Sequence, residues 1–169
     1  MKVMQLISST GFYGAENVVV SLADKLRSLG VESYLGIFLN SKNPHVEIVD
    51  IAEKLDIPVK VFSCNGRFDI NTVISIRRFL KKNNIDIVHS HGYKSNFFSI
   101  LSSAFSKTKI ICTCHNWLKT DLKMEVYRQF DKFLMNRFPK IIAVSEFLED
   151  EISRNLVSGD KVTVIENGI

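Results

Sequence analysis

Short apolar runs alternate with longer amphipathic stretches along the whole chain, and this alternation constrains the fold more than any other feature. The apolar runs predict strands at residues 2–8, 32–39, 59–63, 85–90, 109–114, 140–145 and 161–166. Apolar residues at three- and four-residue spacing predict helices at 15–30, 45–56, 70–84, 95–106, 121–138 and 146–156. Such alternation builds βαβ units and a parallel sheet covered on both faces. We therefore expect an α/β fold, a Rossmann-like doubly wound parallel sheet of about seven strands.

Size and composition favour a single domain over residues 1–169. The chain is 46% hydrophobic and 24% charged, which is enough apolar material for a compact core. Its apolar runs are far shorter than a membrane span, and the opening MKVMQLISST predicts a first strand rather than a signal peptide. The cysteines at 64, 112 and 114 lack the CxxC spacing of metal sites. They fit a reduced compartment, so we expect a cytoplasmic protein.

The basic residues are spread along predicted helices, and the formal net charge is +4. Solvated helix faces account for the two densest groups, although weak peripheral association with an anionic membrane surface is a second expectation. A nucleic-acid partner is not expected, because no helix-turn-helix, zinc-finger or RNP-type signature is present. The two groups are Arg77, Arg78, Lys81 and Lys82, and Lys119, Lys123, Arg128, Lys132, Arg137 and Lys140.

The loop STGFYGAE follows the first predicted strand, at the edge of the sheet where ligands bind in folds of this class. Glycine lets a ligand approach the backbone closely, and a helix N-terminus favours anions, so Gly14 is a candidate phosphate contact. A tight turn that needs positive φ is the structural alternative. Glu16 either bonds a ligand hydroxyl or offsets the helix dipole. The nucleotide fingerprints G-x-G-x-x-G and GxxxxGK[ST] are absent.

Three histidines follow or end predicted strands. His89 and His91 point to the same side of their strand because the strand period is two. We interpret His89 as a hydrogen-bonded structural histidine, and place His91, Tyr93 and Lys94 on a loop that can meet a polar ligand. A zinc site made with His115 is an alternative, but no cysteine or carboxylate stands at ligand spacing, and we expect no metal.

The segment TCHNW is the most suggestive of chemistry. His115 and Asn116 directly follow a predicted buried strand, where a histidine can donate or accept a hydrogen bond at a reacting centre. A structural histidine bonded to backbone is the alternative. Arg67, Lys119 and Arg128 are basic groups that together would suit a phosphorylated or acidic substrate, although each alone is readily explained as surface.

Several segments, in this order, resemble one family. The chain is similar to the N-terminal domain of family 4 glycosyltransferases, which have the GT-B fold, and the likeness covers nearly its whole length. It departs from the family at Gly11-Phe12-Tyr13-Gly14, where many members have adjacent glycines. The matching segments are GFYGAENVVVSLADKLRSLG, DIVHSHGYKS, KIICTCHNW, KIIAVSEFLEDEI and KVTVIENGI.

The resemblance implies transfer of a sugar from a nucleotide-sugar donor to an acceptor, with retention of configuration and without a metal or other cofactor. His115 would lie near the anomeric centre as the catalytic histidine, and Gly14 and Glu16 would lie at the donor diphosphate. The acceptor would be contacted by Arg67, Tyr93, Lys94, Asn116 and Arg128. The family's donor-binding C-terminal domain would lie beyond residue 169, so we expect the 169 residues to be inactive alone.

Two other function classes stay open at this stage. A flavodoxin-like module that binds FMN is one, because SSTGFYGAE loosely resembles a Ser/Thr-rich phosphate loop. A non-catalytic binding domain is the other, because a fold does not fix a function. The sugar, the nucleotide and the acceptor are not identified by the sequence.

Overall fold

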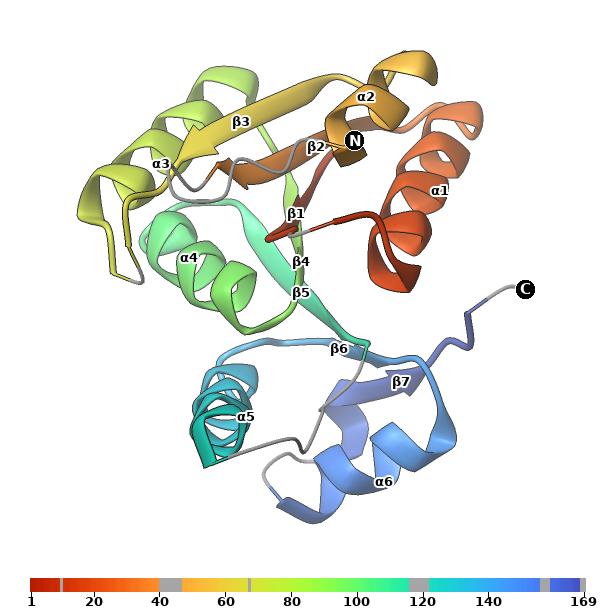
Figure 1. Ribbon diagram of the computed structural model, residues 1–169, viewed down its shortest axis with the longest axis vertical. Helices are drawn as coiled ribbons and strands as arrows, with labels where there is room; N and C mark the ends of the chain where they lie inside the picture. Colours follow the sequence, from red (N-terminus) through yellow and green to blue (C-terminus); the bar gives the residue numbers. More distant parts are fainter. Residues whose placement is uncertain (10, 40–46, 67, 116–121, 156–158, 168–169) are drawn as a thin grey trace.

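The structure, a computed structural model, describes residues 1–9, 11–39, 47–66, 68–115, 122–155 and 159–167 (Figure 1). The strands are β1 (Lys2–Ile7), β2 (Glu32–Leu39), β3 (Val59–Ser63), β4 (Ile87–His91), β5 (Lys109–Cys114), β6 (Ile141–Ala143) and β7 (Val162–Val164). The helices are α1 (Gly14–Ser28), α2 (Glu47–Lys54), α3 (Ile70–Asn83), α4 (Tyr93–Ser103), α5 (Leu122–Met135) and α6 (Glu146–Asn155), with a 3₁₀ turn at Gly159–Lys161.

The strands form one parallel sheet in the order β3-β2-β1-β4-β5-β6-β7. This confirms the predicted doubly wound α/β fold. It also rules out the flavodoxin-like alternative, whose five strands follow the order 2-1-3-4-5. The order reverses between β1 and β4, and ligands of such sheets bind outside the carboxyl ends of the strands at that point.

Helices pack on both faces of the sheet (Figure 1). One core cluster joins α1 and α2 to β1 and β2, with Val19, Ile48 and Ile37 fully or almost fully buried. A second joins α3 and α4 to the opposite face through Ile76 and Phe98. A third lies between α5, α6 and the last three strands. Neighbouring residues of β1 and β2 therefore face different clusters, as Leu6 and Ile7 and as Ile37 and Phe38 do, in line with the strand period.

Local signals explain where α1 begins and ends and where α3 begins. The first turn of α1 is capped by its own Glu16, whose Oε2 accepts a hydrogen bond of 3.1 Å from the backbone N–H of Tyr13. The helix stops before Gly30, which has φ 79°. Asp69 caps α3 by accepting from the backbone N–H groups of Asn71 and Thr72.

The structure corrects the loop predicted after the fourth strand. His91 is the last residue of β4 rather than a loop residue, and Tyr93 and Lys94 form the first turn of α4. Gly92, at φ 82°, makes the whole connection between them. Within the described residues, no helix has both the length and the apolar character needed to cross a membrane.

Candidate active site

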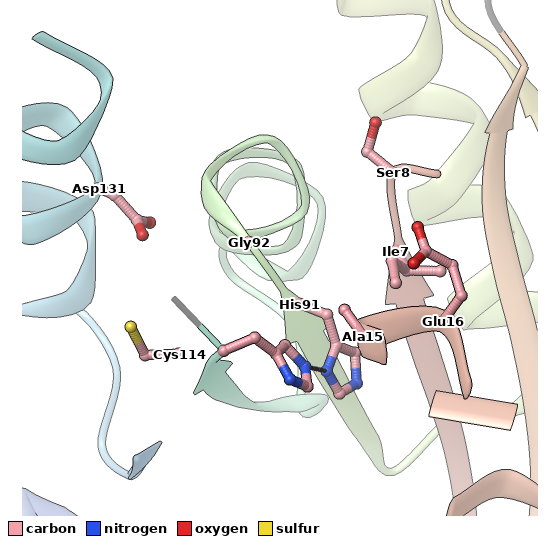
Figure 2. A pocket seen from close by; sticks show the side chains of 9 residues that line it. Ile7, Ser8, Ala15, Glu16, His91, Gly92, Cys114 and Asp131 are labelled. Carbon is pink, nitrogen blue, oxygen red and sulfur yellow. Dashed lines mark hydrogen bonds between the residues drawn. The ribbon is translucent and has the colours of Figure 1, made fainter. Parts of the chain in front are cut away.

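A pocket of about 170 Å³ opens at the carboxyl edge of the sheet, at the point where the strand order reverses. Figure 2 shows Glu16, Ala15, Ile7 and Ser8 on one side of it and Asp131 and Cys114 on the other. Residues from β1, α1, β4, β5 and α5 thus meet although they are far apart in the sequence. The full lining is Ile7, Ser8, Ala15, Glu16, His91, Gly92, Cys114, His115 and Asp131.

The N-terminus of α1 supplies one wall. Gly14 is the first residue of the helix, its φ is not positive, and a Cβ added there would meet nothing within 4 Å. The structural alternative, a turn that needs positive φ, is therefore wrong for Gly14. The first backbone N–H groups of a helix have no partner inside it, so this wall suits an anion. The side chain of Glu16 is buried and lines the pocket beside them.

A hydrogen-bonded pair of imidazoles also lines the pocket. Nε2 of His115, directly after β5, lies 2.9 Å from Nδ1 of His91. The other nitrogen of His91, Nε2, lies 2.9 Å from Oε1 of Gln5 in β1. The remaining nitrogen of His115, Nδ1, is buried without a partner among the described residues. His115 therefore has one ring nitrogen held by the protein and one left over.

His89 is a structural histidine, as the sequence predicts. Its Nε2 lies 2.7 Å from Oγ1 of Thr113, and it is buried. Its ring lies 4.3 Å, centroid to centroid, from that of His91, which confirms that the two share one side of β4. The part of the chain that the structure describes contains no group of His, Cys, Asp or Glu side chains arranged to hold a metal ion.

Burial keeps these histidines neutral. It lowers the pKa of His89 to about 4, with the nearby His115 adding to the effect. Burial also lowers the pKa of His91 well below its ordinary value, and the neighbouring imidazoles His89 and His115 lower it further. For His115 burial again lowers the pKa, against an opposing attraction from Glu16. The site therefore offers uncharged imidazole at neutral pH.

Two of the predicted acceptor contacts lie next to the pocket at the start of α4. Tyr93 stacks on Tyr127 of α5, with ring centroids 4.9 Å apart and planes 6° from parallel. The ammonium group of Lys94 lies over the ring of Phe38 at 4.8 Å. Tyr93 is 38% exposed, so part of its ring is open to a ligand.

Arg128 is held by carboxylates. It donates to both oxygens of Glu125, at 2.8 and 2.6 Å, and to Glu151 of α6 at 2.7 Å. The bond to Glu151 ties α5 to α6, and the bonds to Glu125 stay within α5. The residues that line the pocket do not include Arg128. The two other predicted acceptor contacts, Arg67 and Asn116, lie outside the described residues, as does the basic residue Lys119.

Three lining or supporting residues were not found from the sequence. Asp131 of α5 lines the pocket, and its Oδ1 accepts a hydrogen bond of 2.7 Å from Asn96. Gln5 supports His91 from inside an apolar strand, where a lone polar residue was the available signal. Cys114, for which the sequence suggests no role in the site, is buried with a pKa raised by burial, and it also lines the pocket.

A larger cavity, of about 720 Å³, lies at the opposite, amino end of the strands. It is bordered by the end of α3 and by the connection from α4 to β5, including Arg77, Lys107 and Phe105. Arg77 and Lys81 of the first basic group line it, but none of the residues predicted to act in catalysis, donor binding or acceptor binding does. The smaller pocket therefore remains the candidate site.

Comparison with solved structures supports the same fold. Over its whole length the chain matches HepE from Anabaena in complex with UDP, at TM-score 0.81 and 19% identity, and covers 44% of that chain. It matches a glycosyltransferase from Rickettsia africae at TM-score 0.79 and 22% identity, covering 99% of this chain and 43% of the other. The lipopolysaccharide outer core galactosyltransferase WaaB matches at TM-score 0.76 and 15% identity, covering 100% and 46%.

The chain thus spans less than half the length of these structures. No curated protein sequence matches it. The family model for Glycosyltransferase Family 4 matches residues 12–169, which is nearly the entire chain and includes Gly14, His91 and His115. The chain therefore belongs to glycosyltransferase family 4.

Proposed function

We propose that this chain is the N-terminal, acceptor-side domain of an enzyme that transfers a sugar from a nucleotide-sugar donor to an acceptor with retention of configuration. The observation that carries the proposal is the pocket in which a helix N-terminus and a neutral histidine face one another. A helix N-terminus suits the donor diphosphate. Neutral imidazole suits the hydroxyls and the developing charge of a sugar. Family membership and the UDP-bound HepE structure support the same assignment.

The size of the pocket supports a shared donor site. About 170 Å³ is smaller than the roughly 300–1,000 Å³ typical of a pocket for a drug-sized ligand. It has room for one sugar ring or for a phosphate, not for a whole nucleotide sugar. We propose that a second domain, beyond these residues, holds most of the donor, and that residues 1–169 alone are inactive.

Within the site, Gly14 would contact the donor diphosphate through its backbone, because no side chain blocks that approach. Glu16 lies in the same helical turn and would bond a ligand hydroxyl through the carboxylate that also caps the helix. His115 would lie near the anomeric carbon and support the charge that develops there. With no carboxylate assigned as nucleophile, the leaving phosphate would act as base, and no metal would take part.

The acceptor would enter beside α4, where Tyr93 offers a partly open ring and Lys94 a cation. Arg67, Asn116 and Arg128 complete the proposed acceptor set. WaaB acts on lipopolysaccharide outer core, which favours a bacterial glycan or glycolipid as the acceptor class here. We further propose a cytoplasmic enzyme with weak peripheral attachment to the membrane through the cations of α3, which salt would weaken.

The experiment is a transfer assay with the full-length protein, a panel of nucleotide sugars and candidate glycan and lipid-linked acceptors. Product formation with one donor, insensitive to a chelator, is the expected result. The coupling constant of the anomeric proton in the product then reports retention or inversion. Binding of a donor without transfer to any acceptor would favour a non-catalytic domain instead.

A further inference from the structure

A row of three hydrogen-bonding side chains leads from the interior of the sheet to the pocket. Gln5 in β1 is fully buried, His91 ends the neighbouring strand, and His115 follows the next strand in the sheet. Both links are 2.9 Å long: Gln5 Oε1 to His91 Nε2, and His91 Nδ1 to His115 Nε2. The row ends at His115 Nδ1, which is buried and has no partner among the described residues.

The chemistry of the first partner decides where the protons lie. An amide oxygen only accepts, so the hydrogen of the first link belongs to Nε2 of His91. A neutral imidazole carries one N–H, and burial keeps His91 neutral. Its Nδ1 must then accept, which makes Nε2 of His115 the donor in the second link. Nδ1 of His115 is consequently left without a hydrogen.

We propose that Gln5 and His91 are positioning residues that hold His115 in the tautomer with hydrogen on Nε2, so that Nδ1 accepts a hydrogen bond from a ligand hydroxyl. This inference rests on the proposed function for the identity of the ligand as a sugar. An imidazole nitrogen without hydrogen attracts a hydroxyl and repels a phosphate oxygen. His115 would thus bind the sugar of the donor and not its phosphates. The phosphates would bind at the N-terminus of α1, in whose first turn Glu16 lies.

The buried amide nitrogen of Gln5 indicates that packing alone does not account for a glutamine at this position. Nε2 of Gln5 is buried without a partner, which costs free energy that an apolar side chain of the same length would avoid. Gln5→Met removes this unpaired nitrogen, but it also takes away the acceptor of the buried N–H of His91, so its two effects on stability oppose each other. An apolar residue would fill the same space without an unpaired nitrogen, which favours the bond to His91 as the reason for a glutamine here.

The test reads the tautomer of His115 directly. Histidine labelled with ¹⁵N in the 169-residue chain, which has its own continuous sheet and core clusters, gives distinct nitrogen shifts for the two neutral tautomers. Each signal is assigned by substituting one histidine at a time. We expect hydrogen on Nε2 of His115 in the unaltered chain and a mixture of tautomers in Gln5→Met. Thr113→Val, which removes the partner of His89 but not of His91, should leave His115 unchanged.

Hydrogen on Nδ1 of His115 in the unaltered chain would overturn the proposal, because the row would then run in the opposite direction. An unchanged tautomer in Gln5→Met would overturn it as well. The measurement needs no substrate, so it stays decisive if the proposed transferase activity fails. In the full-length enzyme, Gln5→Met should lower kcat about tenfold, the equivalent of one hydrogen bond of about 1.4 kcal/mol, while Thr113→Val should not.

Discussion

His91 and His115 share a hydrogen bond of 2.9 Å that joins the last residue of β4 to the residue directly after β5. Both rings are in a pocket wall built where the strand order reverses. Because burial lowers the pKa of each, neither ring is charged at neutral pH. The pair therefore gives the site a polar group without a charge, and several measurable consequences follow from its burial.

Stability should fall on mild acidification. The pKa of His89 is about 4 in the folded chain against the ordinary value of 6.5, so the unfolded chain binds more protons between these values. The contribution of His89 is fully present above pH 6.5 and is lost as the pH falls towards 4, which amounts to about 3 kcal/mol. His91 adds to the loss in the same direction. Denaturant unfolding at a series of pH values measures this.

His89→Gln is the matched control for that titration. Glutamine can still bond Thr113 but does not titrate, so the slope of stability against pH between 6.5 and 4 should become shallower. An equally steep slope in this variant would show that His89 is not the group responsible. Carboxylates with lowered pKa values, such as Glu125 at about 2, lose their contribution to stability mainly below the pH range in which His89 titrates. They are also the same in both proteins, so they do not affect the comparison of slopes.

Gly14→Ala should separate stability from donor binding. A Cβ at Gly14 meets nothing within 4 Å, and alanine is the better helix former, so the variant should be as stable as the unaltered protein or more so by about 0.5–1 kcal/mol. If the donor diphosphate approaches the backbone there, KM for the donor should rise severalfold. Thermal unfolding measures the effect on stability, and initial rates at a series of donor concentrations measure the donor KM. A stable variant with an unchanged donor KM would contradict the phosphate role of Gly14.

Arg128 should prove important for stability. Arg128→Met leaves Glu151, only 16% exposed in its side chain, without its 2.7 Å partner, and should cost about 1–2 kcal/mol. The double variant with Glu151→Gln should recover part of that loss, because the largely buried carboxylate, to which Lys132 makes only a weaker approach at 4.0 Å, is gone. Denaturant unfolding of the two single variants and the double variant measures the coupling. If the free-energy losses of the two single variants simply add in the double variant, the ion pair makes no contribution, which would contradict this prediction. A rise in the acceptor KM of a folded Arg128→Met protein would separately support the proposed acceptor contact.

The fold was predictable because its signals are local. Strand alternation and helical spacing located every strand and α-helix among the described residues. Gly30 and Asp69 end and begin helices by backbone chemistry that acts within a few residues. The loop after the fourth strand was predicted wrongly, since one glycine with positive φ suffices to join β4 to α4. Sequence spacing alone does not show how short such a connection can be.

The site was only partly predictable because it depends on contacts between strands. The period of two placed His89 and His91 on one side, and the carboxyl-edge rule brought His115 near them. Their bonds to Gln5 and Thr113 depend on register and on diagonal contacts across the sheet, which no local pattern reveals. Asp131 was one acid among several on a charged helix, so nothing distinguished it.

The most direct test of the proposed transferase compares turnover of His115→Ala with that of His89→Gln in the full-length protein, using the donor and acceptor found by the transfer assay. His115 lines the pocket, whereas His89 lies on the same side of the sheet but does not line it. The account predicts that His115→Ala loses about 100-fold or more in kcat with folding intact, and that His89→Gln stays near the unaltered rate. Near-normal turnover in a folded His115→Ala protein would contradict it.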